Sequence, residues 1–168
     1  MTDVAIRAAR GDDADGMNAV YNPYIRSSPV TFETEEHDEN WRRTWIEGLA
    51  ASPRHPVLVA AAGRQVCGFA NAAAFDPRGA YETSVKVSVF VAPDFQGKGV
   101  GRALYARLVE ALAIADAHRA YGLIVAPNPA SVALHEAFGF RHVSTLSEVG
   151  RKFGRYWDVM WFEKRLDE

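Results

Sequence analysis

The sequence has little cysteine, no long apolar run and no block of charge of one sign. Its single cysteine, Cys67, cannot close a disulfide within the chain, which is typical of a protein from a reducing compartment. No stretch approaches the length of a membrane span, and residues 1–20 lack the basic start, apolar run and cleavage site of a secretory leader. We therefore expect a cytoplasmic protein that does not bind membranes.

Further absences narrow the kind of site. Lysine and arginine together number 19 against 21 aspartates and glutamates, and no basic cluster suggests a surface for nucleic acid. The five histidines lack the spacing of metal ligands, so no metal site is expected. Cys67 stands in "GRQVCGFANA" without an adjoining basic residue or histidine, and we interpret it as a packed core residue. Because no basic cluster is present, we expect any anion to be bound at a small local site and not on an extended basic surface.

The 168 residues, 48% of them hydrophobic, predict one domain over 1–168, because no repeat, low-complexity tract or linker divides the chain. Alternating apolar residues predict strands, and four-residue apolar spacing predicts helices. The expected strands are Val4–Ala9, Val57–Ala62, Gln65–Phe75, Tyr81–Val91, Tyr121–Ala126 and two more near the C-terminus; the expected helices are Ala14–Ser27, Glu35–Ala50, one from Val100, and Asn128–Phe138. The expected apolar helix faces consist of Trp41, Trp45 and Leu49, and of Val100, Leu104, Leu108 and Leu112. This order predicts an α/β (α+β) fold with helices flanking one twisted mixed sheet.

Three glycines stand within five positions between the clearest predicted strand and a helix, in "FVAPDFQGKGVGRALYARLVEAL". A helix N-terminus presents N–H groups without intrahelical partners, so Gly97, Gly99 and Gly101 predict an anion site there, with a plain tight turn as the alternative. The Walker loop is excluded because no Lys-Ser/Thr pair ends the segment. The dinucleotide fingerprint is excluded because Arg102 stands where it requires a third glycine.

The pattern Gln96-x-x-Gly99-x-Gly101 resembles the acyl-CoA pyrophosphate loop of the Gcn5-related N-acetyltransferase (GNAT) superfamily. The whole chain resembles its branch of phosphinothricin and methionine sulfoximine/sulfone acetyltransferases, through "YNPYIRSSPVTFETE", "RGAY", "VSVFVAPDFQGKGVGRALY", "NPASVALHEAFGF" and "GRKFGRYWDV". The resemblance implies a mostly antiparallel GNAT sheet, acetyl-CoA as cosubstrate, a small-molecule amine as acceptor and a homodimer. The C-terminal "RYWDVMWFEKRL" is then expected to form an edge strand, with Trp157 and Trp161 buried in the dimer.

The resemblance also implies which residues bind the cosubstrate. The backbone of Val89 and Val91 is expected to pair with the pantetheine arm, with the Val89 amide polarising the acetyl carbonyl. Asn128 and Ser131 match cofactor contacts, although an N-cap pair is an equal alternative. His135 matches the position of an acid for the leaving thiolate, and the alternative is a packed core histidine. The full expected set is Val89, Val91, Gln96, Gly97, Lys98, Gly99, Val100, Gly101, Arg102, Asn128, Ser131 and His135.

The principal departure from that branch is Lys86, which stands where relatives carry a glutamate thought to be the general base. A lysine accepts a proton only if its pKa is strongly lowered. We weigh three roles for Lys86: an anion contact for the acceptor, with water or Glu82 relaying the proton; a base of depressed pKa; or a solvated strand residue. The first is preferred, because strand alternation places Glu82, Ser84 and Lys86 on one face. Asp76 is a second departure, at a position where relatives can carry lysine.

The expected acceptor-binding residues are Phe32 and Glu33, after the first helix, together with Arg78, Tyr81 and Lys86. Arg78 suits a carboxylate, and its alternative is a surface charge in a turn. The sequence thus predicts an N-acetyltransferase acting on a small amino acid or analogue by direct attack of the amine on the thioester. Two alternatives stay open: a different amine, such as a protein N-terminus, lysine or polyamine, and an acyl-CoA-binding domain with little turnover.

Overall fold

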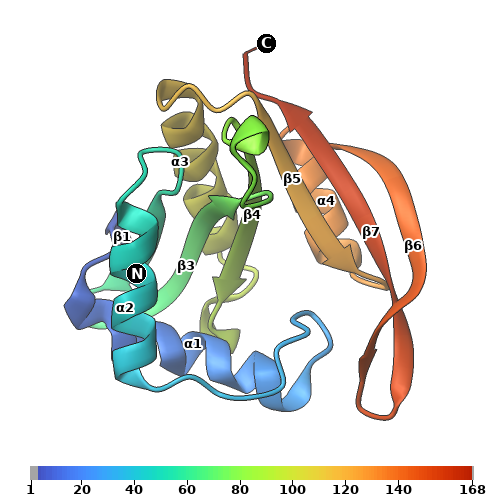
Figure 1. Ribbon diagram of the computed structural model, residues 1–168. Coiled ribbons are helices and arrows are strands. Elements are labelled where there is room, and N and C mark those ends of the chain that lie inside the picture. Colours follow the sequence, from blue (N-terminus) through green and yellow to red (C-terminus); the bar gives the residue numbers. More distant parts are fainter. Residues whose placement is uncertain (1–3, 168) are drawn as a thin grey trace.

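The computed structural model describes residues 4–167 (Figure 1). Within this range one seven-stranded sheet has the order β1-β2-β3-β4-β5-β7-β6. Its strands are β1 Val4–Ala8, β2 Val57–Ala62, β3 Gln65–Ala74, β4 Ser84–Val91, β5 Arg119–Val125, β6 Arg141–Lys152 and β7 Arg155–Arg165; the α-helices are α1 Ala14–Ser27, α2 Glu39–Ala50, α3 Val100–Ile114 and α4 Pro129–Ala137. Only β4 and β5 pair in parallel, which confirms the predicted mixed, mostly antiparallel sheet.

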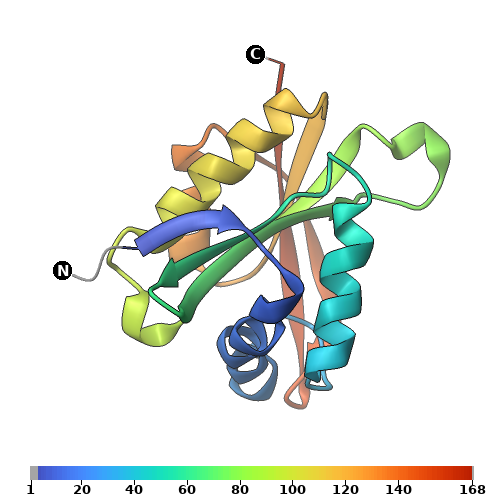
Figure 2. The ribbon, with the colours of Figure 1, turned by 90° about the vertical axis from the view of Figure 1, so that its left-hand side faces the viewer.

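Helices cover both faces of the sheet (Figure 2). On one face α3 buries the predicted stripe of Val100, Leu104, Leu108 and Leu112. On the other face α1 and α2 enclose a second cluster that includes Phe69 of β3. Cys67 is fully buried beneath α3, which confirms its interpretation as a core residue. None of the helices within residues 4–167 is long and apolar enough to cross a bilayer.

The α2 helix differs from the prediction in its start and in its buried face. It begins at Glu39 rather than Glu35, because the Asp38 side chain accepts the Trp41 N–H and caps the helix. Arg42 and Ile46 are buried, whereas Trp41 is 41% exposed. The Arg42 guanidinium lies 4.8–5.6 Å from the centroids of four aromatic rings, including those of Tyr21 and Phe69. The Arg42 side chain is therefore buried on a face of α2 that the apolar pattern did not predict to be buried.

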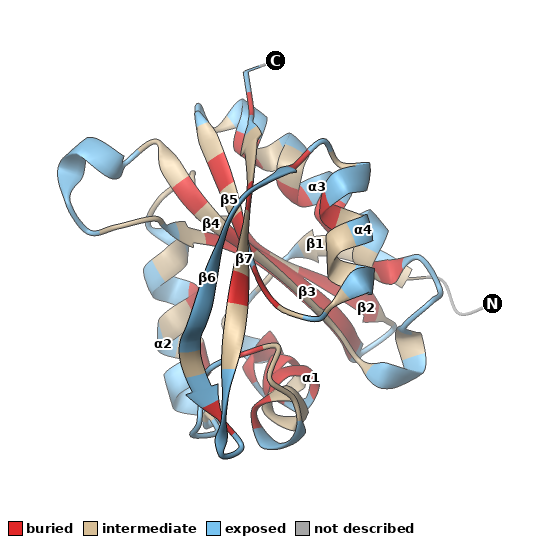
Figure 3. Ribbon diagram, turned by 90° about the vertical axis from the view of Figure 1, so that its right-hand side faces the viewer, coloured by how far each residue is buried: buried red, intermediate tan, exposed pale blue. Residues whose placement is uncertain are grey.

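Two strand predictions were also wrong. A 3-10 turn, η2 Gly79–Tyr81, precedes β4, so Glu82 lies outside the strand and does not share the alternating face of Ser84 and Lys86. The C-terminal segment forms β7, which pairs with both β5 and β6 and is not an edge strand. The edge strand on this side of the sheet is β6, whose residues are mostly exposed (Figure 3). The apolar pattern of one strand does not indicate which strands pair with it on its two sides.

Candidate functional site

The candidate site lies where β4 and β5 separate. Their pairing runs from Ser84 opposite Arg119 to Val87 opposite Gly122, and beyond it the two strands diverge (Figure 1). The β3 strand remains paired with β4 as far as Val91, so only the edge of β4 toward β5 opens. A cavity of about 580 Å³ occupies this opening, between the ends of β4 and β5, the glycine loop and the start of α4. Backbone groups of an unpaired strand edge are available to an extended ligand.

The glycine loop forms one end of this cavity. Gly97 and Gly99 have left-handed φ values of +69° and +82°, and a Cβ on either would meet nothing within 4 Å. Their glycine identity therefore follows from backbone conformation and not from crowding inside the protein. Gly99 is the N-cap of α3, so the first amides of the helix face the opening without a side-chain cap. This geometry suits a phosphate or another anion.

The other predicted loop residues differ in their surroundings. Gln96, Gly101 and Arg102 line the cavity with the two left-handed glycines. The Val100 side chain is buried in the α3 core, and the Lys98 ammonium lies 5.7 Å from the centroid of the Phe95 ring. Neither of these two side chains lines the cavity, so any contact from Val100 to a ligand would come from its backbone.

The start of α4 forms the opposite end of the cavity. The Asn128 side chain accepts the Ser131 N–H at 3.1 Å, which confirms the N-cap interpretation of Asn128. Asn128 and Ser131 also line the cavity, so capping and ligand contact are compatible. The predicted helix start at Asn128 was one residue early, because that residue caps the helix from outside.

His135 lies one turn further along α4 and is 4% exposed. Its Nδ1 lies 2.8 Å from the Ser131 carbonyl oxygen; because a carbonyl only accepts, Nδ1 carries the proton. Burial lowers the pKa of His135, so the ring is neutral and Nε2 has a lone pair and no proton to give. Nε2 is buried without a hydrogen-bond partner among residues 4–167. His135 is thus a packed histidine that also lines the cavity, and its role as an acid stays a prediction.

Tyr24 of α1 is a cavity residue that the sequence reasoning missed. Its Oη donates to the Val91 carbonyl at 2.5 Å and accepts from Gln96 Nε2 at 2.8 Å. This pair of bonds joins α1, the end of β4 and the glycine loop, and burial raises the pKa of the Tyr24 hydroxyl. Tyr24 belongs to the family-like stretch "YNPYIRSSPVTFETE", but nothing in that stretch indicates a partner 67 positions away.

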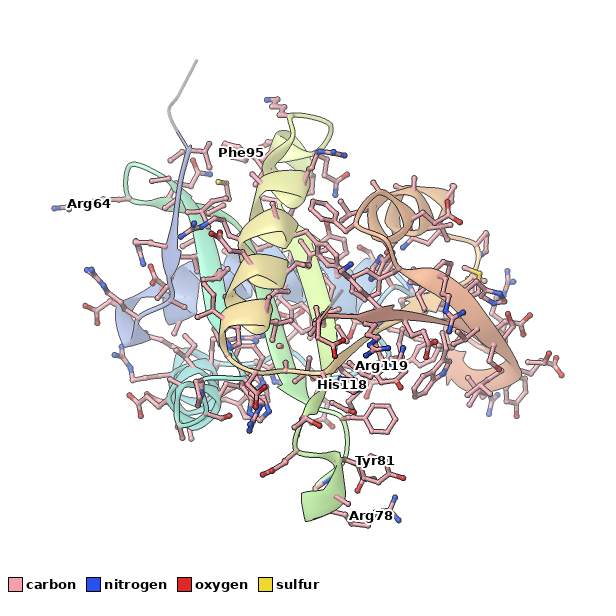
Figure 4. The ribbon with its side chains drawn as sticks, turned by 90° about the horizontal axis from the view of Figure 1, so that it is seen from above. Arg64, Arg78, Tyr81, Phe95, His118 and Arg119 are labelled. Atoms are coloured by element: carbon pink, nitrogen blue, oxygen red, sulfur yellow. The ribbon has the colours of Figure 1, made fainter. Side chains whose placement is uncertain are left out.

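The residues predicted to bind the acceptor lie in two other places. Arg78 and Tyr81 extend from the body on the η2 segment (Figure 4). The Arg78 guanidinium binds Asp76 at 2.7 and 3.2 Å and lowers the pKa of that carboxyl, so its fork is already engaged. Lys86 is half-buried on β4, with Tyr121 beside it on β5. None of these residues lines the cavity between β4 and β5.

Phe32 and Glu33 belong to the loop between α1 and α2, where a second hollow of about 420 Å³ also contains His37 and Trp41. Glu33 is hydrogen-bonded to His37 and accepts from the Tyr21 hydroxyl at 3.4 Å. The structure therefore brings most of the predicted cosubstrate residues together at one opening. The predicted acceptor residues are divided between this loop and the η2 side of β4.

Comparison with known proteins agrees with this arrangement. A family model described as "Acetyltransferase (GNAT) domain" matches residues 6–161. The chain is 44% identical to "Phosphinothricin N-acetyltransferase" of Streptomyces coelicolor, over 98% of the chain and 97% of the relative. It is 30% identical to "L-methionine sulfoximine/L-methionine sulfone acetyltransferase" of Salmonella typhimurium, over 98% and 96%. The structure of the Salmonella typhimurium protein yncA with its cofactor acetyl-CoA matches with a TM-score of 0.93 and 30% identity, over 98% and 95%.

Proposed function

Because the chain belongs to the GNAT acetyltransferase family, we propose that it transfers the acetyl group of acetyl-CoA to the amino group of a small amino acid or analogue, such as phosphinothricin or methionine sulfone. The observation that supports this most is the unpaired edge of β4 beside the open N-terminus of α3. We further propose that residues 1–168 act as one acetyltransferase domain.

The residues at the opening fit acetyl-CoA, which supplies the acetyl group as a thioester. The backbone of Val89 and Val91 would bind its extended arm, and the Val89 amide would polarise the acetyl carbonyl. The amides around Gly97 and Gly99 would bind its phosphates at the start of α3. Tyr24 and Gln96 fix the Val91 carbonyl that faces this opening. Binding in this way positions the reacting groups without any covalent enzyme intermediate.

The acceptor amine must lose a proton, and Lys86 is not assigned that role. We propose that its ammonium binds an anionic group of the acceptor while solvent water takes the proton. The position of Lys86 on β4, on the face opposite the buried Val85 and Val87, supports an acceptor contact. Because Glu82 lies outside β4, a relay through Glu82 from the same strand face is not part of this proposal.

Thiol release from acetyl-CoA, measured with a panel of acceptors, tests the proposal. Phosphinothricin, methionine sulfone, ordinary amino acids, a polyamine and a peptide would each be offered to the purified protein. We expect release with the first two and with some amino acids. Release with the peptide or polyamine alone would support the alternative acceptor class, and acetyl-CoA binding without release would support a binding domain.

The role of Lys86 is tested with Lys86→Met, which removes the charge and keeps most of the side-chain length. We expect the KM for phosphinothricin to rise about tenfold with kcat little changed, because the lost contact serves binding. An acceptor amine without an anionic group is the control, and its KM should not change. A fall in kcat at constant KM would instead indicate proton transfer by Lys86.

We also propose that the protein is a cytoplasmic homodimer, with β6 in the subunit interface. Exposed apolar side chains on the β6–β7 hairpin support this: Val143, Leu146, Val149, Phe153 and Tyr156 are 41–56% exposed. Within residues 4–167, Trp157 donates to the Lys152 carbonyl and Trp161 packs near Phe75 and Tyr121, and their burial by a partner chain stays a prediction. Analytical ultracentrifugation of the wild type and of Val149→Glu would test the interface.

A further inference from the structure

Lys152, the last residue of β6, is a buried lysine in the family-like stretch "GRKFGRYWDV", to which the sequence analysis assigned no role. It is 5% exposed, although lysine is rarely buried without a partner of opposite charge. Its Nζ donates to the carbonyl oxygens of Thr31 at 2.7 Å, Ser28 at 2.8 Å and Tyr24 at 3.5 Å. Lys152 forms no ion pair within residues 4–167. Since an ammonium has three N–H donors, all three are directed to backbone carbonyls.

These carbonyls belong to the end of α1 and to the loop that follows it. Ser28 is the C-cap of α1, where a cation is favoured by the helix dipole. Thr31 directly precedes Phe32 and Glu33, the two residues that the resemblance assigns to the acceptor. Thr31 itself is held from the other side, because its Oγ1 lies 2.6 Å from the Tyr21 hydroxyl. Lys152 thus fixes the backbone next to the predicted acceptor residues.

The same hairpin contacts this loop at a second point. The ring of Phe32 lies directly against Gly150, and a Cβ at Gly150 would overlap the ring. The β6–β7 turn lies beside the C-terminal end of α1 in two views (Figures 1 and 3). The charge on Glu33 is close enough to raise the pKa of Lys152, against the larger lowering effect of burial. Lys152 therefore holds the backbone that precedes Phe32, and Gly150 lies against the Phe32 ring.

Tyr24 connects this contact to the cosubstrate opening. Its carbonyl accepts from Lys152, while its hydroxyl donates to the Val91 carbonyl of β4. The last turn of α1 is thus bonded to the hairpin at one side and to the separating strand at the other. A displacement of residues 28–33 would move mainly Phe32 and Glu33, because the Tyr24 hydroxyl keeps its own hydrogen bonds to Val91 and Gln96.

We propose that Lys152 is a positioning residue for the acceptor amine: its ammonium fixes residues 28–33, so that Phe32 and Glu33 form a rigid side of the acceptor site. This inference rests on the proposed function. It assigns the hairpin a role in acceptor binding beyond its place in the sheet. If Lys152 served only general stability, its replacement would not change the KM for the acceptor more than the KM for acetyl-CoA.

The test compares Lys152→Met with Lys152→Arg and with the control Arg151→Met, at the exposed neighbour on the same strand. Steady-state kinetics give KM for the acceptor and for acetyl-CoA, and hydrogen exchange reports on residues 28–37. We expect Lys152→Met to raise the acceptor KM about tenfold and the acetyl-CoA KM by less than about twofold. Exchange should accelerate in 28–37 and stay unchanged in β2 and β3. Lys152→Arg should restore part of the affinity, and Arg151→Met should resemble the wild type.

An unchanged acceptor KM, or equal increases in both constants, would overturn the proposal. If Lys152→Met does not fold, Gly150→Ala displaces the Phe32 ring without removing the ammonium, and it should raise the acceptor KM in the same selective way. If the wild type acetylates no amine, the proposed function fails, while hydrogen exchange still decides whether Lys152 holds residues 28–33 in place. Protection of residues 28–37 that is the same in wild type and Lys152→Met would then contradict it.

Discussion

At the scale of single residues, the site depends on backbone conformation more than on reactive side chains. Gly97 and Gly99 adopt left-handed φ values in open space beside the α3 amides. The predicted site residue Lys86 has no carboxylate to act as a base, and Nδ1 of His135 is directed to the Ser131 carbonyl. The remaining contribution of the protein is to bind, orient and polarise, which agrees with direct attack by an amine.

Gly99→Ala tests the role of the loop backbone. A methyl group at a left-handed residue costs about 1 kcal/mol and would extend into the opening. Gly63 is a matched control, because it has a φ of +62°, would also have nothing within 4 Å of an added Cβ and lies in the β2–β3 turn. Calorimetric titration should show acetyl-CoA binding weakened about tenfold by Gly99→Ala. Gly63→Ala should lose similar stability and keep the wild-type affinity; equal affinities for both variants would exclude the loop from the binding site.

The pKa of His135 predicts a pH effect on stability. Burial lowers this pKa below the ordinary value of 6.5, so on acidification through that value the unfolded chain binds a proton that the folded chain resists. The stability contribution is therefore complete above pH 6.5 and declines below it, by at most about 1.4 kcal/mol per pH unit. His55, whose pKa burial also lowers, contributes in the same direction.

Urea unfolding between pH 8 and pH 5 measures this effect. His135→Gln should lose less stability over this range than the wild type, because it lacks one of the two histidines whose pKa burial lowers. The difference between the two proteins at pH 8 serves as the baseline for the packing change. Identical slopes for both proteins would show that the pKa of His135 is the same in the folded and unfolded states.

At the scale of elements, the separation of β4 from β5 creates the opening, and the packing of α4 on β5 determines its depth. The His135 ring occupies the space that Gly122 leaves without a side chain. Tyr105 and Phe140 surround the same ring, with centroid distances of 5.1 and 5.2 Å. Gly122 is thus required by the close approach of helix and strand.

Gly122→Ala should reduce the free energy of unfolding by about 1–3 kcal/mol, because its methyl group overlaps His135 in a filled core. Thermal and urea denaturation would measure this change. The double variant Gly122→Ala/His135→Ala should be more stable than the sum of the two single changes predicts, since the smaller residue makes room. Strict additivity of the two changes would contradict direct contact between α4 and β5 at this point.

Element-scale predictions from the sequence were correct where one face was uniformly apolar. The α3 stripe was predicted from periodicity alone, because burial on a single face is a local property. The predicted face of α2 was correct for Trp45 and Leu49, which pack against the second cluster, and it missed Arg42, which is stabilised by rings from other elements. The edge position of β6 could not be predicted, because it depends on strand order.

At the scale of the whole molecule, one sheet carries two cores and brings distant segments to its open end. The glycine loop and the Asn128 cap could be located from the sequence, because their signals are local. Tyr24 and Lys152 could not, because their partners are 67 and up to 128 positions away. The predicted acceptor residues lie in two regions, the α1–α2 loop and the η2 side of β4, and their spatial relation also could not be predicted from the sequence.

Acetyl transfer to an amino acid is tested by mass spectrometry of phosphinothricin after incubation with the protein and acetyl-CoA carrying a ¹³C-labelled acetyl group. We predict that the amino acid gains one labelled acetyl group on its nitrogen and that the protein itself carries none. Labelled acetyl on the protein would contradict direct attack by the amine. Intact acetyl-CoA, with no acetylated product from phosphinothricin, methionine sulfone or any amino acid, would contradict the assignment of this chain as an amino-acid N-acetyltransferase.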